Sequence, residues 1–189
     1  MTDSARAACR DGAAGRGVPG AHVVRKLCAA QWASPLASAG KFGLVSVSSM
    51  CDRWADEFEH KYAAGDPRLR LDPGLARAGI ELFRALPRTA DREVLLYTDM
   101  HPENVLAARR EPWLAIDPKP YVGDPTYDAL QHMLNHPARL ATDPTGFVGR
   151  MAELLDLEPS RLRNWLFARS VQESIDAPNL REVAIALRP

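Results

Sequence analysis

Apolar residues recur with a helical spacing in the first half of the chain. Met50, Trp54, Phe58 and Tyr62 follow one another at intervals of four residues, with charged residues between them. This spacing places the four side chains on one face of an α-helix, because a helix completes a turn in about 3.6 residues. The turn-forming residues of Gly65-Asp-Pro67 are expected to end that helix.

Further helices are predicted after this break. Pro73 suits a first helical turn, and apolar residues share one side of the next segment as far as Leu86, before Pro87 ends the pattern. Beyond Gly123 the chain is expected to be helical, with segments at Tyr127–Asn135, Gly146–Leu157 and, after the start signal of Pro159, Ser160–Ile175. The second half of the chain is therefore predicted to be mostly helical.

Short β-type runs flank a polar cluster between the predicted helices. Val94–Tyr97 leads into the polar cluster Thr98–Asn104, and Val105–Ala108 follows it. Arg109–Pro112 is typical of a hairpin turn, because another β-type run, Trp113–Ile116, comes next. We expect a short β-hairpin with a polar loop before its first strand and an acidic residue directly after its second.

The first 48 residues have a different character. They are rich in Ala, Gly and Ser and end in the strand-like run Phe42–Ser48. We expect poor order there, with one short helix near His22–Gln31. Gly15–Gly20 spells the G-x-G-x-x-G pattern of nucleotide-binding loops, but no strand-like run precedes it and Pro19 would stiffen it. This pattern is therefore not expected to bind a nucleotide.

Charge and cysteine content exclude several classes of partner. Lys and Arg together number 24, as do Asp and Glu, so there is no overall field to hold a polyanion and no nucleic-acid partner is expected. No apolar run approaches the roughly 20 residues of a membrane span, which predicts no membrane partner. Cys9, Cys28 and Cys51 form an odd set without C-x-x-C spacing, so neither a disulfide framework nor a zinc knuckle is expected. These features predict a soluble cytoplasmic protein.

The polar cluster carries the residue types that phosphoryl transfer needs. Asp99 and Asn104 lie five residues apart, and Asp117 follows Asp99 by eighteen residues. One carboxylate can accept the proton of an attacking hydroxyl, while an amide and a second carboxylate can hold magnesium. Protein-kinase-type cores arrange these groups as D-x-x-x-x-N, a short hairpin and another Asp. On spacing alone, the alternative is that the three residues only cap turns and helices.

Two longer segments extend this pattern to a family resemblance. Leu96–Leu106, and Glu111–Asp128 with the sequence EPWLAIDPKPYVGDPTYD, resemble the aminoglycoside phosphotransferase family in its streptomycin 6-kinase and hydroxyurea-resistance branch. The likeness continues through Gln131–Asn135 and Phe167–Ile175 and covers about residues 50 to 189. It implies an α+β, protein-kinase-like fold, in which a mostly helical C-terminal lobe at 49–189 contains a short β-hairpin that carries the catalytic loop, preceded by the atypical segment 1–48.

The resemblance also implies a function and roles for the site residues. The chain would transfer the γ-phosphate of ATP to an alcohol group of an aminoglycoside such as streptomycin and so confer antibiotic resistance, with hydroxyurea left open as another acceptor. Asp99 would be the general base, Asn104 a magnesium ligand and Asp117 the principal magnesium ligand. ATP and Mg²⁺ are the implied cofactors, and a small-molecule aminoglycoside is the implied partner.

The loop departs from the family's usual sequence, His-Gly-Asp-Leu-His-Pro-Gly-Asn. This chain has Tyr97 in place of the first His, Thr98 in place of the first Gly and Glu103 in place of the second Gly. His101 and Pro102 are retained, and we expect them to shape the loop rather than to react.

Other polar residues are given weaker roles. Asp124 and Asp128 are expected to be structural, as helix-start residues or as supports of the metal ligands. Lys119 is given no role, because its sequence position fits a solvated side chain as well as one that reaches a phosphate. Glu173 and Asp176 are candidates to contact a cationic substrate near the general base, with an ordinary solvated helix face as the alternative.

Two histidines have the spacing of a helical zinc pair. His132 and His136 are four residues apart, but Met133 stands where a zinc peptidase of the H-E-x-x-H type has its Glu, and no third ligand is evident. We expect both histidines to lie on a helix face without metal.

The resemblance leaves one part of a kinase without a counterpart. A kinase of this kind has a smaller lobe that covers ATP, with a lysine that grips the phosphates and a glutamate that pairs with it. About 48 residues precede the likeness, and neither Lys26 nor Lys41 lies in a matching strand context. We therefore expect an absent or truncated N-terminal lobe, and possible self-association through the exposed seam between the lobes. The alternative function is a truncated, inactive kinase-like fragment or pseudokinase that acts only as a binding module, and a misassigned start of the reading frame is a third explanation.

Overall fold

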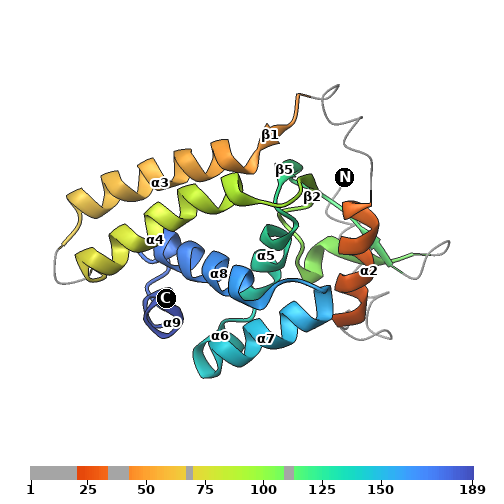
Figure 1. Ribbon diagram of the computed structural model, residues 1–189. Helices are drawn as coiled ribbons and strands as arrows, with labels where there is room; N and C mark the ends of the chain where they lie inside the picture. The colour runs from red at the N-terminus through yellow and green to blue at the C-terminus, as the bar shows by residue number, and fades with distance from the viewer. Residues whose placement is uncertain (1–20, 34–42, 67–69, 109–112) are drawn as a thin grey trace, which may run out of the picture.

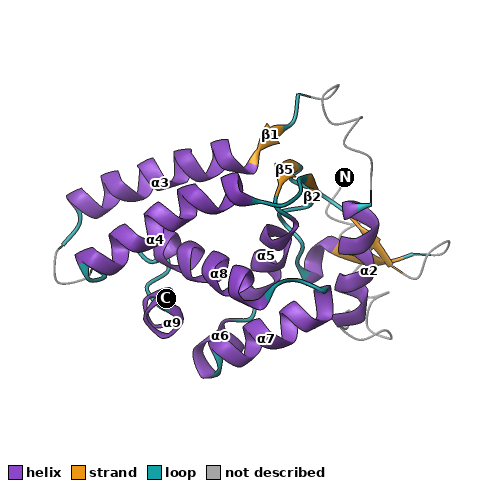
Figure 2. Ribbon diagram, in the orientation of Figure 1, coloured by secondary structure: helices purple, strands orange, loops and turns teal. Residues whose placement is uncertain are grey.

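Helices make up most of the described residues and pack beside two small β-sheets (Figure 1). The computed structural model describes residues 21–33, 43–66, 70–108 and 113–189. The predicted α+β class, mostly helical, is confirmed (Figure 2). In chain order, the described elements are α2 (Ala21–Trp32), β1 (Val45–Ser46), α3 (Val47–Ala64), α4 (Pro73–Ala85), the 3₁₀ turn η3 (Leu86–Thr89), β2 (Val94–Leu96), η4 (Pro102–Asn104), β3 (Val105–Ala107), β4 (Trp113–Ala115), β5 (Tyr121–Gly123), η5 (Pro125–Tyr127), α5 (Asp128–Leu134), α6 (Pro137–Thr142), α7 (Pro144–Leu155), α8 (Pro159–Glu173) and α9 (Leu180–Leu187).

The start of α3 differs from the expected strand. The run predicted as a strand as far as Ser48 is extended only at β1, while Phe42 lies outside the described residues. The helix begins at Val47 because the Ser46 hydroxyl accepts a hydrogen bond from the backbone N–H of Ser49, at 3.2 Å, and so caps the first turn. The strand prediction was therefore wrong for the end of this run.

The helical core is formed where α3, α4, α8 and α9 lie together (Figure 1). Trp165 on α8 is fully buried, and its ring meets that of Phe83 on α4 edge to face, with centroids 6.2 Å apart. Gly79 allows the close approach of α4 and α8, because a Cβ there would lie 2.5 Å from a methyl carbon of Val171. Within the described part of the chain, no helix combines the length and apolarity needed to cross a membrane.

The two small sheets are joined by two connections. In the first sheet, β5 pairs in parallel with β1 and antiparallel with β2; in the second, β3 and β4 are antiparallel, with Leu106 opposite Leu114. The predicted hairpin strands are confirmed, while the predicted turn Arg109–Pro112 lies outside the described residues. The chain passes from β2 to β3 through Tyr97–Asn104, here called the first connection, and returns from β4 to β5 through Ile116–Pro120, the second connection. All three predicted site residues lie on these two connections.

One helix from the first 48 residues packs against the sheets. α2 agrees with the helix expected near His22–Gln31, and it contacts β2, β4 and α7. Val23 on α2 is buried in a small apolar cluster with Tyr97, Met100 and Val105. The pattern at Gly15–Gly20, with Cys9 and Lys41, lies outside the described residues, and the division at 48/49 stays a prediction.

Candidate active site

The two connections are bonded to each other by backbone and side-chain groups. The backbone N–H of Lys119 donates to the carbonyl of Tyr97 at 3.1 Å, and that of Ile116 donates to the carbonyl of Asn104 at 2.9 Å. The Tyr97 hydroxyl also donates to the Ile116 carbonyl, and the Thr98 hydroxyl donates to the Lys119 carbonyl. The connections therefore hold their side chains in a fixed relation.

Asp99 and Asp117 meet at one ammonium group. Lys119 Nζ lies 3.0 Å from Asp99 Oδ2 and 3.5 Å from Asp117 Oδ2. These two carboxylates, Asp99 above all, raise the pKa of Lys119. The Asp99 side chain is 25% exposed and that of Asp117 is 72% exposed, so Asp99 is the more enclosed of the two. The structure thus brings together the predicted base and the predicted metal ligand, and it places between them a lysine to which the sequence assigned no role.

Asn104 folds back against the same loop. Its side-chain Nδ2 donates to the backbone carbonyl of Asp99 at 2.9 Å, and its backbone N–H donates to the carbonyl of His101, also at 2.9 Å. Asn104 is buried, with 8% of its surface exposed. Because the amide nitrogen is bonded to the loop, the amide oxygen is the atom of Asn104 suited to a cation.

Two residues of the connections have left-handed backbones. Thr98 has φ 53° and Asp117 has φ 54°. Such a conformation costs a residue other than glycine about 1–3 kcal/mol, and Thr98 stands where the family's usual loop has Gly. The Thr98 backbone N–H donates to Asp128 Oδ1 at 2.8 Å, and this bond, together with that of its hydroxyl, holds the strained conformation in place.

Asp128 supports the backbone of the first connection through hydrogen bonds. It is 1% exposed and accepts hydrogen bonds from the backbone N–H groups of Tyr97, at 3.0 Å, and Thr98, and from the indole N–H of Trp32, at 2.9 Å. Burial raises the pKa of Asp128 to about 6, while the three hydrogen bonds act in the opposite direction. The expected structural role of Asp128 is therefore confirmed, and Trp32 on α2 takes part in it.

Asp124 has a second structural role, at the start of η5. Its carboxylate accepts hydrogen bonds from Arg161 Nε at 2.7 Å, Trp165 Nε1 at 2.6 Å and the backbone N–H of Thr126 at 2.9 Å. Arg161 also donates to the carbonyl of Leu86 at 2.7 Å. This network joins the end of the first sheet to α8 and η3, and the hydrogen bonds named here involve no residue of the two connections.

The residues of the two connections fit a magnesium ion. Magnesium prefers oxygen ligands and is usually held by one or two carboxylates together with phosphate oxygens and water. Asp99 and Asp117 already share one cationic group, and Asn104 offers an amide oxygen beside the Asp99 backbone. The donor set is thus suitable, while the base role of Asp99 and the metal roles of Asn104 and Asp117 stay predictions.

The histidine pair lies only partly on a helix. His132 belongs to α5, whereas His136 lies between α5 and α6, so the expectation that both lie on one helix face was wrong for His136. The rings of His132 and His136 meet edge to face, with centroids 4.8 Å apart. Burial lowers the pKa of His132 to about 4. Among the residues that the structure describes, no group of three or more His, Cys, Asp or Glu side chains is arranged to hold a metal.

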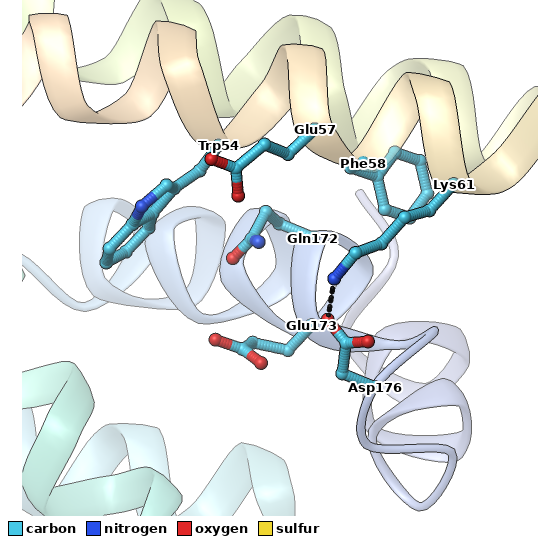
Figure 3. A pocket seen from close by; sticks show the side chains of 7 residues that line it. All are labelled: Trp54, Glu57, Phe58, Lys61, Gln172, Glu173 and Asp176. Carbon is cyan, nitrogen blue, oxygen red and sulfur yellow. Dashed lines mark hydrogen bonds and ion pairs between the residues drawn. The ribbon is translucent and has the colours of Figure 1, made fainter.

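Glu173 and Asp176 lie away from Asp99. They line a cavity of about 200 Å³ between α3 and the C-terminal end of α8 (Figure 3), at the other side of the molecule from β2 and α2 (Figure 1). Glu173 pairs with Arg169 at 2.6 Å, and Asp176 pairs with Lys61, also at 2.6 Å. The structure therefore does not bring these two carboxylates to the candidate site, and cations of the same chain already pair with them.

A larger cavity lies beside the first connection. It has a volume of about 350 Å³ and is lined by residues of α2, β2 and β4 and by both connections, among them Leu27, Met100 and Trp113. None of its lining side chains is charged. Leu114, one of the lining residues, is 53% exposed. The cavity offers apolar surface beside Tyr97 and Met100, and the expected self-association through an exposed seam stays a prediction.

Comparison with known proteins places the chain in a family. Residues 50–179 match the family described as aminoglycoside/hydroxyurea antibiotic resistance kinase. The chain is 39% identical over 149 residues to a hydroxyurea phosphotransferase of Kitasatospora aureofaciens, over 77% of this chain and 38% of that protein. It is 42% identical over 87 residues to a streptomycin 6-kinase of Streptomyces griseus, over 43% of this chain and 28% of that protein. The chain thus spans well under half the length of these relatives, and no solved structure matches it. The region that matches the family includes both connections. The chain therefore belongs to the aminoglycoside/hydroxyurea antibiotic resistance kinases.

Proposed function

We propose that the chain carries the reaction centre of an ATP-dependent phosphotransferase that acts on a hydroxyl of an aminoglycoside such as streptomycin. The proposal includes a protein-kinase-like C-terminal lobe in which the β3–β4 hairpin and the first connection form the catalytic loop. It is supported by the family match and by the names of the relatives, which are a hydroxyurea phosphotransferase and streptomycin 6-kinases. Transfer of a phosphoryl group to an antibiotic is the route by which such an enzyme would confer resistance.

One geometric observation carries the proposal. The carboxylates of Asp99 and Asp117, eighteen residues apart in sequence, both contact the Lys119 ammonium, at 3.0 and 3.5 Å. Residues that only cap separate turns are not expected to contact one shared cation, whereas phosphoryl transfer needs two carboxylates and an amide in one place. The alternative of three unrelated capping residues accounts poorly for this arrangement.

The three residues divide the work in the proposed reaction. Asp99, the more enclosed carboxylate, orients the acceptor hydroxyl and takes its proton as the hydroxyl oxygen bonds to the γ-phosphorus and ADP leaves. Asn104 and Asp117 would hold magnesium, with Asp117 as the principal ligand. When bound, magnesium neutralises charge on the phosphoryl group that is transferred. Asp128 and Thr98 keep the first connection in the conformation that presents Asp99.

The proposal is tested by mass spectrometry of candidate acceptors. The purified full chain is incubated with ATP and MgCl₂ and with streptomycin, hydroxyurea or spermidine, the last being a cationic amine without a hydroxyl group. We expect streptomycin to gain the mass of one phosphoryl group and spermidine to remain unchanged. Reactions without ATP or without magnesium should give no product.

The contradicting outcome is equally definite. If the chain unfolds cooperatively, and is therefore folded, but phosphorylates neither streptomycin nor hydroxyurea, the phosphotransferase proposal is overturned for this chain. The result would favour the alternative of a kinase-like binding module. Phosphorylation of hydroxyurea alone would keep the reaction type and correct the acceptor.

A further inference from the structure

Lys119 lies where a positive charge is needed. Its ammonium group contacts one carboxylate from each connection, Asp99 Oδ2 at 3.0 Å and Asp117 Oδ2 at 3.5 Å. Without a cation between them, these two carboxylates would repel each other. The lysine therefore supplies, in the protein alone, a positive charge beside Asp117, where magnesium is proposed to bind during the reaction.

The backbone of Lys119 is held while its side chain stays accessible. Its N–H donates to the Tyr97 carbonyl, and its carbonyl accepts from the Thr98 hydroxyl. Pro118 and Pro120 flank it and restrict the local backbone further. The side chain is nevertheless 57% exposed. A move of the ammonium group from Asp117 thus requires only side-chain rotation and leaves both connections intact.

The two contacts of the ammonium are not equal. The contact with Asp99 is shorter, and the Asp99 side chain is the less exposed of the two carboxylates. An arriving divalent cation would meet Asp117, which is mostly exposed, and would repel the ammonium because the two carry like charge. Lys119 would then give up Asp117 and keep Asp99.

We propose that Lys119 is the resident counter-cation of the reaction centre, holding Asp99 and Asp117 together before magnesium binds and competing with magnesium for Asp117. This inference rests on the proposed function, because it takes Asp117 as a magnesium ligand. The competition weakens metal binding to the protein alone. Magnesium then binds well only when the phosphates of a nucleotide add the negative charge that compensates both cations.

The inference predicts that removing the lysine charge tightens metal binding. Metal affinity of the full chain is measured without nucleotide, by electron paramagnetic resonance of Mn²⁺ and by competition of Mg²⁺ against it. Lys119→Met should bind Mg²⁺ roughly fivefold more tightly than the wild type, the size expected of a partly exposed ion pair. Lys119→Arg keeps the charge and should stay near the wild-type affinity.

A matched control separates this local effect from net charge. Lys61→Met removes the same charge from the Lys61–Asp176 pair, which lies in the cavity between α3 and α8. It should leave the Mg²⁺ affinity unchanged. A Lys61→Met variant that tightens binding as much as Lys119→Met would overturn the inference, since any lost positive charge would then suffice.

A third variant distinguishes failure of the inference from failure of the metal site. If Asp117→Asn weakens Mg²⁺ binding but Lys119→Met leaves it unchanged or weakens it, the counter-cation role is overturned and the proposed magnesium ligand stands. If Asp117→Asn leaves Mg²⁺ binding unchanged, the magnesium role of Asp117 fails, and the inference about Lys119 fails with it.

Discussion

Replacing Asp99 by Asn is expected to lower kcat for phosphorylation of the acceptor by about 10³-fold, within the range that general bases contribute. An amide cannot take up the proton of the attacking hydroxyl, but it has nearly the same shape as the carboxylate. Its oxygen can still accept the hydrogen bond from Lys119 Nζ, which lies 3.0 Å from Asp99 Oδ2 in the wild type. The KM for the acceptor should change little. The measurement is the steady-state rate of product formation by mass spectrometry.

Two controls make the Asp99 result specific. Glu103→Gln makes the same chemical change on the same connection, at an exposed residue without a proposed role, and should keep the wild-type rate. The free energy of unfolding of Asp99→Asn should stay within about 0.5 kcal/mol of the wild type, because the Asp99 side chain is partly exposed. A folded Asp99→Asn variant with kcat within a few-fold of the wild type would rule out Asp99 as the base.

Replacing Asp128 by Ala is expected to lower the free energy of unfolding by about 3 kcal/mol. Each of the three donors left without an acceptor, two backbone N–H groups and the Trp32 indole, costs about 1–3 kcal/mol. Part of this loss is offset, because burying the Asp128 carboxyl is itself costly, as its pKa of about 6 indicates. Chemical denaturation of both proteins at neutral pH gives the difference.

Two milder variants divide the Asp128 effect among its partners. Asp128→Asn keeps Oδ1 for the N–H groups of Tyr97 and Thr98. It loses Oδ2, the acceptor of Trp32 and of a second, longer bond from the Tyr97 N–H at 3.2 Å, so it should cost about 1 kcal/mol. Trp32→Phe removes the same bond from the other side. Combining the two should cost little more than either alone, because both break one interaction. A double variant whose cost is the full sum would show that Trp32 and Asp128 do not interact.

Most of the helices were predictable because their signals are local, although no separate helix was predicted at α6 or α9. The spacing from Met50 to Tyr62 lies within one helix, and prolines mark the first turns of α4, α7 and α8. The start of α3 at Val47 was missed, because a β-branched run is typical of strands until the cap at Ser46 is recognised. The strand β5 has three residues and depends on pairing with β1 and β2, which no local pattern reports.

The sequence predicted that the candidate residues lie close together along the chain, but not how the two connections are bonded to each other. The D-x-x-x-x-N spacing pointed to Asp99 and Asn104, and both lie on the first connection, bonded to each other. The contacts of Lys119 depend on two connections that run between separate sheets and lie side by side, and Trp32 reaches Asp128 across 96 residues of chain. Contacts of this kind follow from tertiary packing, so a single sequence carries no direct signal for them.

The central claim, that Asp99 and Asp117 belong to one phosphotransfer centre, is tested most directly by a double-mutant cycle on phosphoryl transfer. The rate of phosphate transfer from ATP to the acceptor is measured for the wild type, Asp99→Asn, Asp117→Asn and the double variant, with all four proteins shown to be folded. Residues that act as one catalytic unit give strongly non-additive losses. We therefore expect the double variant to be about as slow as the slower single variant. Losses that multiply in the double variant, or single variants that match the wild-type rate, would contradict the claim.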